Sequence, residues 1–137
     1  VVCEDFPTLK NVPVEERPWS KETLATDLAS SNIGLAPLPD NPFTRGTCSF
    51  KVLEYSAAGL PVVASPVGTN AEHVRDSVTG FLAKSGDEWI ERITQLIESP
   101  QLRVDMGKQG REFAREFDAS IIGERLTDVM RDCIGSK

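Results

Sequence analysis

A lysine and a glutamate three positions apart are the residues of this chain with the clearest chemical potential. Lys51 and Glu54 lie in a stretch, residues 46–58, that predicts a loop followed by a short helix. Side chains three positions apart are neighbours on one face of a helix. The first amides of a helix lack intrahelical partners and attract anions. An anion site with one cation and one carboxylate suits a nucleoside diphosphate, because the carboxylate can accept hydrogen bonds from the ribose.

Two other chemical interpretations of this region are weaker. The spacing from Gly46 to Lys51 is like that of a phosphate-binding P-loop, but no glycine directly precedes the lysine and Val52 replaces the Ser or Thr that binds Mg²⁺. Cys48 could act as a nucleophile with His73, but we expect Cys48 to be buried as a small hydrophobic residue. His73 is the single histidine and is expected on the surface of a short helix, so we expect no metal site.

Short apolar runs alternate with helical patterns over the first two thirds of the chain. The expected strands are residues 1–3, 12–14, 33–38, 61–65 and 78–82, and the expected helices are residues 21–31, 48–58 and 71–76. The run at 61–65 is continuously apolar, as in strands buried on both faces of a parallel sheet. Residues 40–46 are expected to form a loop, and Gly59 is expected to cap the end of the helix before it. The loop at 68–70 follows a strand at its carboxyl end, where ligands bind in α/β proteins.

The last third of the chain is helical in pattern. Ser85 and Glu88 predict a capping box, and Ser99 with Pro100 predicts the start of the next helix. Apolar residues recur at helical spacing as far as Cys133, and the aromatic residues among them are expected in the core. Strands that alternate with helices predict an α/β fold with a Rossmann-like parallel sheet covered by helices on both faces. We expect residues 1–84 to form this α/β core and residues 85–137 to form a helical C-terminal extension.

Composition bounds the class of protein. The chain has 137 residues and a net charge of −6, which argues against nucleic acid as a partner. Its three cysteines are widely spaced, which favours a reducing, cytoplasmic setting without disulfides. No apolar run approaches the ~20 residues that cross a bilayer. The chain begins with Val-Val-Cys instead of an initiator methionine, so we expect it to be a piece of a larger protein.

A resemblance to a known family rests on paired motifs. Residues 51–55 read Lys-Val-Leu-Glu-Tyr, and residues 58–64 read Ala-Gly-Leu-Pro-Val-Val-Ala. Residues 67–68, 70–72 and 79–82 add Val-Gly, Asn-Ala-Glu and Thr-Gly-Phe-Leu. Together these motifs resemble the C-terminal, nucleotide-sugar-binding lobe of a GT-B glycosyltransferase of the group 1 (family 4) type. The resemblance extends from about Trp19 to Phe117.

The resemblance implies a donor-binding role for named residues. Glu54 would accept hydrogen bonds from the ribose hydroxyls, while the amides around Ser49, Phe50 and Lys51 would hold the diphosphate. The Lys51 ammonium would add a point charge, and Arg45 is a second candidate for contact with phosphate or sugar. The donor would be a nucleotide-diphospho-sugar, bound without a metal or other cofactor. No catalytic residue is expected in this chain, because the acceptor side would belong to a missing N-terminal lobe.

The sequence also departs from the family pattern. An acid normally lies eight positions before Glu54 and addresses the donor sugar, but residue 46 is glycine. Contacts with the sugar would have to come from elsewhere, and Asp40 and Thr44 are two candidates. The complete protein would be a transferase, and the isolated chain is expected to be inactive. Two alternatives stay open: a non-catalytic α/β interaction or signalling module, and a lobe of a nucleotide-sugar epimerase of the same fold.

Overall fold

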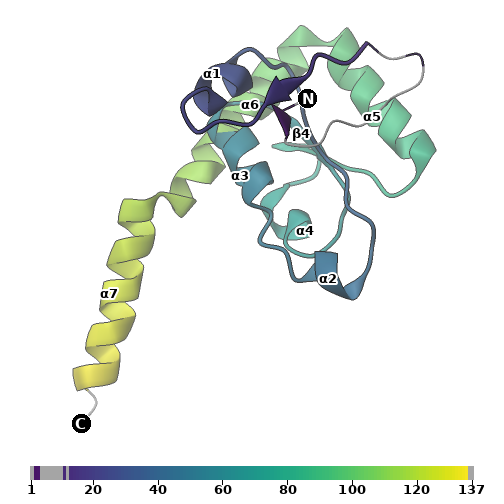
Figure 1. Cartoon of the computed structure of the whole chain (residues 1–137). Coiled ribbons are helices and arrows are strands. Elements are labelled where there is room, and N and C mark those ends of the chain that lie inside the picture. The colour runs from purple at the N-terminus through teal and green to yellow at the C-terminus, as the bar shows by residue number, and fades with distance from the viewer. Residues whose placement is uncertain (1, 4–10, 12, 136–137) are drawn as a thin grey trace. The chain divides into compact units, whose positions relative to one another are not determined.

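The computed structural model describes residues 2–3, 11 and 13–135 and divides into two units, residues 1–31 and 32–137 (Figure 1). In the first unit, β1 (Val2–Cys3) pairs in parallel with β2 (Arg17–Pro18), and α1 (Leu24–Ala29) follows. Arg17 Nη1 donates to Asp27 Oδ1 at 2.9 Å and so ties β2 to α1. Trp19, the tryptophan of this unit, is 53 % exposed.

Two predictions for this unit need correction. The second strand lies at Arg17–Pro18 and not at residues 12–14, of which residue 12 lies outside the described part. A two-residue strand leaves almost no pattern in a sequence, so valine content misplaced it. The helix is shorter than the predicted 21–31, because residues 21–23 form a turn before α1 begins at Leu24.

The second unit is built on three parallel strands. They are β3 (Gly34–Ala36), β4 (Val62–Ala64) and β5 (Gly80–Leu82), in the order β3-β4-β5. The register places Leu35 beside Val63 and Val63 beside Phe81. All three residues of β4 are buried, as the continuous apolar run predicted. The predicted parallel α/β fold is confirmed.

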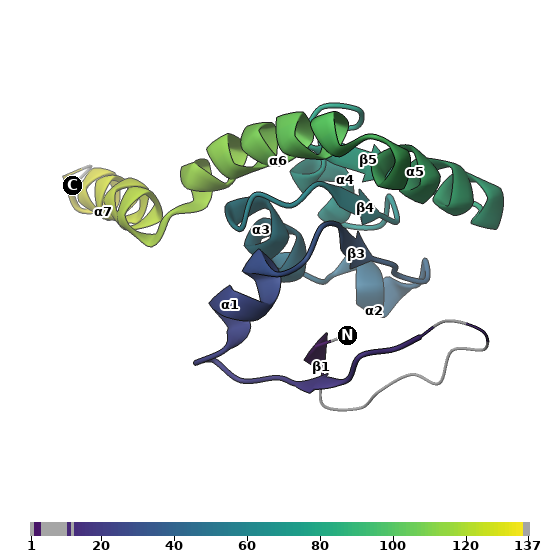
Figure 2. The same ribbon diagram turned by 90° about the horizontal axis from the view of Figure 1, so that it is seen from above.

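Helices cover both faces of this sheet. On one face Val63 and Phe81 pack with Leu96 and Met106, and Trp89 lies half-buried against the same cluster. On the other face Val62 and Ala64 pack with Val52 and Val74. Figure 2 shows the helices of the first cluster, α5 (Gly86–Glu98) and α6 (Pro100–Ala114), lying over the strands. Val52 belongs to α3 (Phe50–Ala57), which also packs against α6.

Local capping explains where several helices begin and end. Ser85 Oγ accepts from Glu88 N at 3.2 Å, while the Glu88 carboxylate accepts from Lys84 N and not from Ser85 N. Ser99 Oγ accepts from Leu102 N at 3.2 Å. Gly59 has a φ of 79°, the left-handed conformation expected after a helix. The predicted helix starts after Ser85 and Ser99 and the predicted helix end before Gly59 are therefore confirmed. The Glu88 carboxylate, however, bonds to the amide of Lys84 and not to that of Ser85.

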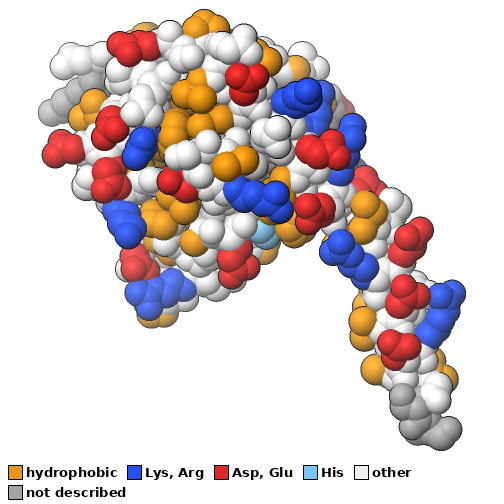
Figure 3. Space-filling view, turned by 180° about the vertical axis from the view of Figure 1, so that it is seen from behind, with side chains coloured by type: hydrophobic (Ala, Val, Ile, Leu, Met, Phe, Trp, Pro, Cys, Tyr) orange, Lys and Arg blue, Asp and Glu red, His pale blue; other side chains and the backbone are white. Residues whose placement is uncertain are grey.

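Three helical segments differ from the prediction. The expected loop at 40–46 contains α2 (Pro42–Arg45), closed by a capping box between Asn41 and Thr44. The helix α4 (Asn70–His73) ends three residues before the predicted position 76. After η1 (Arg115–Phe117), α7 (Ala119–Gly135) has no buried residue, so its apolar face does not contribute to the core. Figure 3 shows hydrophobic side chains along one edge of α7 and charged side chains along the rest.

Over residues 13–135, no helix is both long enough and apolar enough to cross a bilayer.

Candidate functional site

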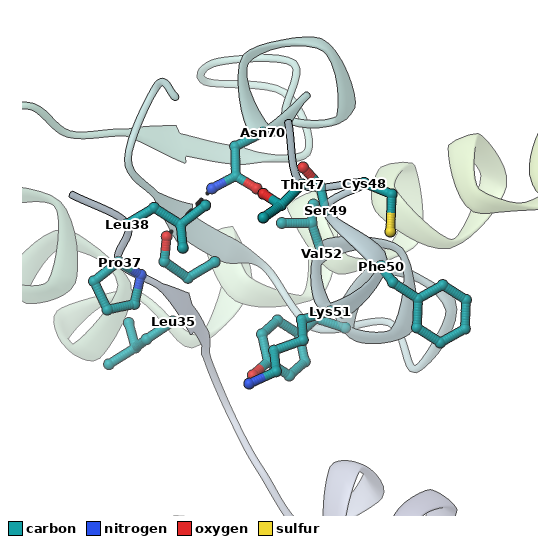
Figure 4. A pocket seen from close by; sticks show the side chains of 12 residues that line it. Leu35, Pro37, Leu38, Thr47, Cys48, Ser49, Phe50, Lys51, Val52 and Asn70 are labelled. Atoms are coloured by element: carbon teal, nitrogen blue, oxygen red, sulfur yellow. Dashed lines mark hydrogen bonds between the residues drawn. The ribbon is translucent and has the colours of Figure 1, made fainter. Parts of the chain in front are cut away.

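A cavity of about 410 Å³ lies where β3 ends and α3 begins. Its walls come from residues 35–38, residues 47–52 and Tyr55, and Asn70 closes it. Figure 4 shows Leu35, Pro37 and Leu38 facing the loop before α3 across this cavity. The carboxyl end of a parallel strand is the usual ligand edge of an α/β sheet. The structure thus brings the predicted loop-helix stretch to that edge.

Four successive backbone amides in this wall have no partner. Within the described residues, the N–H groups of residues 48–51 donate no hydrogen bond, and Val52 N is the first to donate, to Ser49 O at 2.9 Å. All four residues line the cavity. Unpaired amides at a helix start carry partial positive charge. This wall of the cavity is therefore suited to an anion.

The loop before α3 is hydrogen-bonded to the loop between β4 and α4. Ser49 has left-handed backbone angles, φ 50° and ψ 30°, and its hydroxyl lies 2.5 Å from Thr69 Oγ1. Thr69 Oγ1 also donates to Thr47 O at 2.8 Å. Asn70 follows Thr69 as the first residue of α4. Its side-chain amide donates to Ser65 O at 3.2 Å and to Ala36 O at 3.4 Å. These bonds join the loop and the ends of two strands around one cavity.

Sequence reasoning noted the 68–70 loop but missed the roles of its side chains. The contacts of Thr69 and Asn70 join segments up to 34 positions apart in the chain, which no local pattern encodes. Tyr55 was also missed, although Gly34 was a signal for it. A Cβ on Gly34 would lie 2.5 Å from the Tyr55 ring, so the glycine allows the ring to cover β3.

Lys51 and Glu54 differ in their relation to the cavity. Lys51 lines it and is exposed. Glu54 does not line it but lies on the same helix, half-buried, and its carboxylate accepts no hydrogen bond from the described residues. Burial raises the pKa of Glu54 above its usual value, and the charge of Lys51 partly opposes this increase. Glu54 is thus a partly desolvated acid without a hydrogen-bond partner in the described part of the chain.

The remaining predicted donor-binding residues are Phe50, Ser49 and Arg45. Phe50 contributes its amide, while its side chain is 64 % exposed and points away from Leu35 in Figure 4. Ser49 is buried at the cavity wall. Arg45 does not line the cavity; it forms two bonds with Asp40, Nε–Oδ1 at 2.6 Å and Nη2–Oδ2 at 3.0 Å. This pairing lowers the pKa of Asp40.

Thr44 serves the local fold. It is buried, and its hydroxyl donates to Pro39 O at 2.5 Å and accepts from Asn41 N at 3.2 Å. Its bonding capacity is therefore used within the loop that carries α2.

The predicted burial of Cys48 is wrong. Its side chain is exposed, because Cys48 lies in the loop before α3 and not on the buried face of that helix.

His73 is less exposed than the predicted surface position. Its ring is half-buried, 4.9 Å from the Phe117 ring and 6.5 Å from the Phe113 ring between centroids. Burial lowers the pKa of His73, and its Nδ1 has no partner within the described residues. Over that part of the chain, no three His, Cys, Asp or Glu side chains gather as a metal site would require.

Two curated relatives match part of this chain. EpsD of Bacillus subtilis is 36 % identical over 87 residues, which are 62 % of this chain and 23 % of that protein. The D-inositol 3-phosphate glycosyltransferase of Corynebacterium aurimucosum is 30 % identical over 84 residues, 60 % of this chain and 20 % of that protein. The chain thus spans less than a quarter of the length of either relative.

A solved structure shares the fold. The structure of Anabaena HepE in complex with UDP-glucose matches with a TM-score of 0.70 and 23 % identity, over 90 % of this chain and 33 % of that one. The sequence model of the family described as "Glycosyl transferases group 1" matches residues 44–113, a range that includes α3, β4 and α4. The chain therefore belongs to the group 1 glycosyl transferases.

Proposed function

We propose that this chain binds the nucleoside diphosphate part of a nucleotide-sugar donor, and that the complete protein transfers the sugar to an acceptor. The row of unpaired amides at residues 48–51 carries the proposal, because it lines a cavity at the ligand edge of the sheet. Family membership supports the transfer reaction. The structural relative HepE holds UDP-glucose, which makes UDP the first probe to use.

The proposed roles follow from charge and position. The diphosphate would accept hydrogen bonds from the amides of Ser49, Phe50 and Lys51, at the positive end of the α3 dipole. The Lys51 ammonium would add a mobile positive charge. The Glu54 carboxylate would accept from the ribose hydroxyls, which would give this half-buried acid the partner that it lacks. Negative charge that develops on the leaving diphosphate would be stabilised by these fixed dipoles.

Arg45 remains a second candidate for phosphate or sugar contact. Its guanidinium is exposed, and its backbone lies against Gly68, where a Cβ would come within 2.7 Å of Arg45 O. Gly68 directly precedes Thr69 and the cavity residue Asn70. Contact with the donor would require Arg45 to share or leave the Asp40 carboxylate.

A calorimetric titration of the full chain with UDP tests the proposal. We expect Lys51→Ala to lower UDP affinity about tenfold, and Glu54→Gln about tenfold or more, because hydrogen bonds to charged groups are worth roughly 1.5–3 kcal/mol. Inorganic pyrophosphate should bind Glu54→Gln as it binds the wild type, since Glu54 is assigned to the ribose.

Two matched variants serve as controls. Lys108→Ala and Glu98→Gln make the same changes on exposed helical residues outside the cavity, so both should bind UDP normally. A wild-type chain that ignores UDP would favour the interaction-module alternative. Normal binding by both the Lys51 and Glu54 variants would refute the residue assignment.

A further inference from the structure

The Thr69 hydroxyl, in the loop between β4 and α4, is hydrogen-bonded to the loop before α3 that carries the unpaired amides. Thr69 Oγ1 donates to Thr47 O at 2.8 Å. A hydroxyl has one hydrogen, so in the 2.5 Å contact between the two hydroxyls Ser49 is the donor and Thr69 the acceptor. Thr69 thus fixes residues on both sides of Cys48 from outside the loop.

Ser49 depends on such support because of its backbone. Its φ of 50° lies in the left-handed region, which residues other than glycine rarely adopt. Conformations of this kind persist where surrounding contacts determine them. Ser49 is only 8 % exposed, and its hydroxyl has Thr69 as its partner.

The same contact keeps the helix amides open. Serine at the start of a helix usually accepts a hydrogen bond from an amide of the first turn. Ser49 precedes α3 in this position, but its side chain makes no such bond. Its hydroxyl is directed to Thr69 instead. The amide of Lys51, which such a bond could have used, therefore stays unpaired beside that of Phe50 at the cavity wall.

Thr69 is itself firmly placed. On one side, Gly68 has a φ of 55° and lies so close to the Arg45 backbone that a Cβ would come within 2.7 Å of Arg45 O. On the other side, Asn70 is 1 % exposed and bonds to the ends of β3 and β4. A residue between two such fixed neighbours has little conformational freedom, so Thr69 can hold the neighbouring loop in position.

We propose that Thr69 is a positioning residue for diphosphate binding. It holds Ser49 in its left-handed conformation and holds the Ser49 hydroxyl away from α3, so that the loop presents its amides together to the anion. The inference rests on the proposed function, because it assigns a support to the same site. Thr69 itself need not touch the ligand.

Three variants of the full chain test this role with UDP, inorganic pyrophosphate and uridine as probes. Thr69→Val removes the hydroxyl at constant shape and should lower the affinity for UDP and pyrophosphate about tenfold. Uridine carries no phosphate, so its affinity, measured by ligand-observed NMR, should be unchanged. Thr69→Ser keeps both hydrogen bonds and should restore binding. Thr127→Val is the matched control, since Thr127 also donates to a backbone carbonyl at 2.8 Å but lies on α7.

The outcomes separate the two proposals. Equal pyrophosphate affinity for Thr69→Val and wild type would overturn the positioning role while leaving donor binding intact. A parallel loss of uridine binding would also overturn it, since that would show general damage to the site. If the wild type binds neither UDP nor pyrophosphate, the proposed function itself fails. If Thr69→Val does not fold, Ser49→Ala is the deciding variant. It removes one of the two hydrogen bonds and should weaken pyrophosphate binding about threefold. Unchanged binding would refute the positioning role of Thr69.

Discussion

Glu54 is under two opposing demands. Its assigned ligand requires the ionised carboxylate, whereas its partial burial favours the protonated form and raises its pKa. A group with a raised pKa in the folded state binds its proton more tightly there than in the unfolded chain. The contribution of Glu54 to stability is therefore fully present below its ordinary pKa and is lost as the pH rises through the folded value.

This sign leads to a prediction with two opposite effects. Glu54→Gln should weaken UDP binding and, without ligand, raise the melting temperature slightly at pH 7. At pH 4 wild-type Glu54 is largely protonated as well, so the difference in melting temperature should shrink. Thermal unfolding of both proteins at the two pH values measures it. A Glu54→Gln shift that is equal at both pH values would contradict the argument.

The sequence supplied part of the site. A helix with Phe50 and Lys51 in its first turn could be predicted, because helix patterns follow local rules. Its exact start could not: α3 begins at Phe50 and not at residue 48, and Ser49 lies just before it. The donor-binding role of these three residues remains a prediction. The diversion of the Ser49 hydroxyl to Thr69 could not be predicted, because that contact joins residues 20 positions apart.

At the scale of elements, the contact between α3 and α6 depends on glycine. A Cβ on Gly107 of α6 would meet Gly59 O and would lie 2.9 Å from Gly59 C. Arg111 of α6 also donates to Ala57 O at 3.0 Å, at the negative end of α3. The helix that carries the candidate site is therefore held at its far end by α6.

We expect Gly107→Ala to destabilise the fold by about 1–3 kcal/mol, because the new methyl forces the two backbones apart. Urea unfolding followed by circular dichroism measures this change. Gly123→Ala is the matched control, since a Cβ there meets nothing within 4 Å. It lies in α7 and should leave stability equal or raise it by up to about 1 kcal/mol. Equal free energies of unfolding for Gly107→Ala and wild type would show that α6 can move away from Gly59 without loss of stability.

The same scale explains which elements could be predicted. The strand β4 is recognisable because burial on both faces leaves a run of apolar residues. By contrast, α2 has only four residues and is held by the Asn41–Thr44 capping box, so it has no apolar period of its own. The two-residue strand β2 is defined by its pairing with β1, which a single segment cannot reveal.

At the scale of the whole molecule, we expect this chain to bind the donor nucleotide without catalysing sugar transfer. The chain spans 23 % and 20 % of the length of the two relatives, so most of either relative has no counterpart in it. We expect the chain alone to bind UDP without releasing UDP from UDP-glucose faster than buffer does. A coupled assay for free UDP measures this release. Turnover by the chain alone, after removal of contaminating hydrolase activity, would contradict the expectation.

The division into two units has a practical consequence, because each unit carries one of the two tryptophans. Trp19 is largely solvent-facing, and Trp89 packs half-buried against the core of the second unit. A shielded indole emits at shorter wavelength than a hydrated one, so the intrinsic fluorescence contains a separate reporter for each unit. In a Trp19→Phe protein, the remaining emission would follow the unfolding of the second unit, residues 32–137, alone.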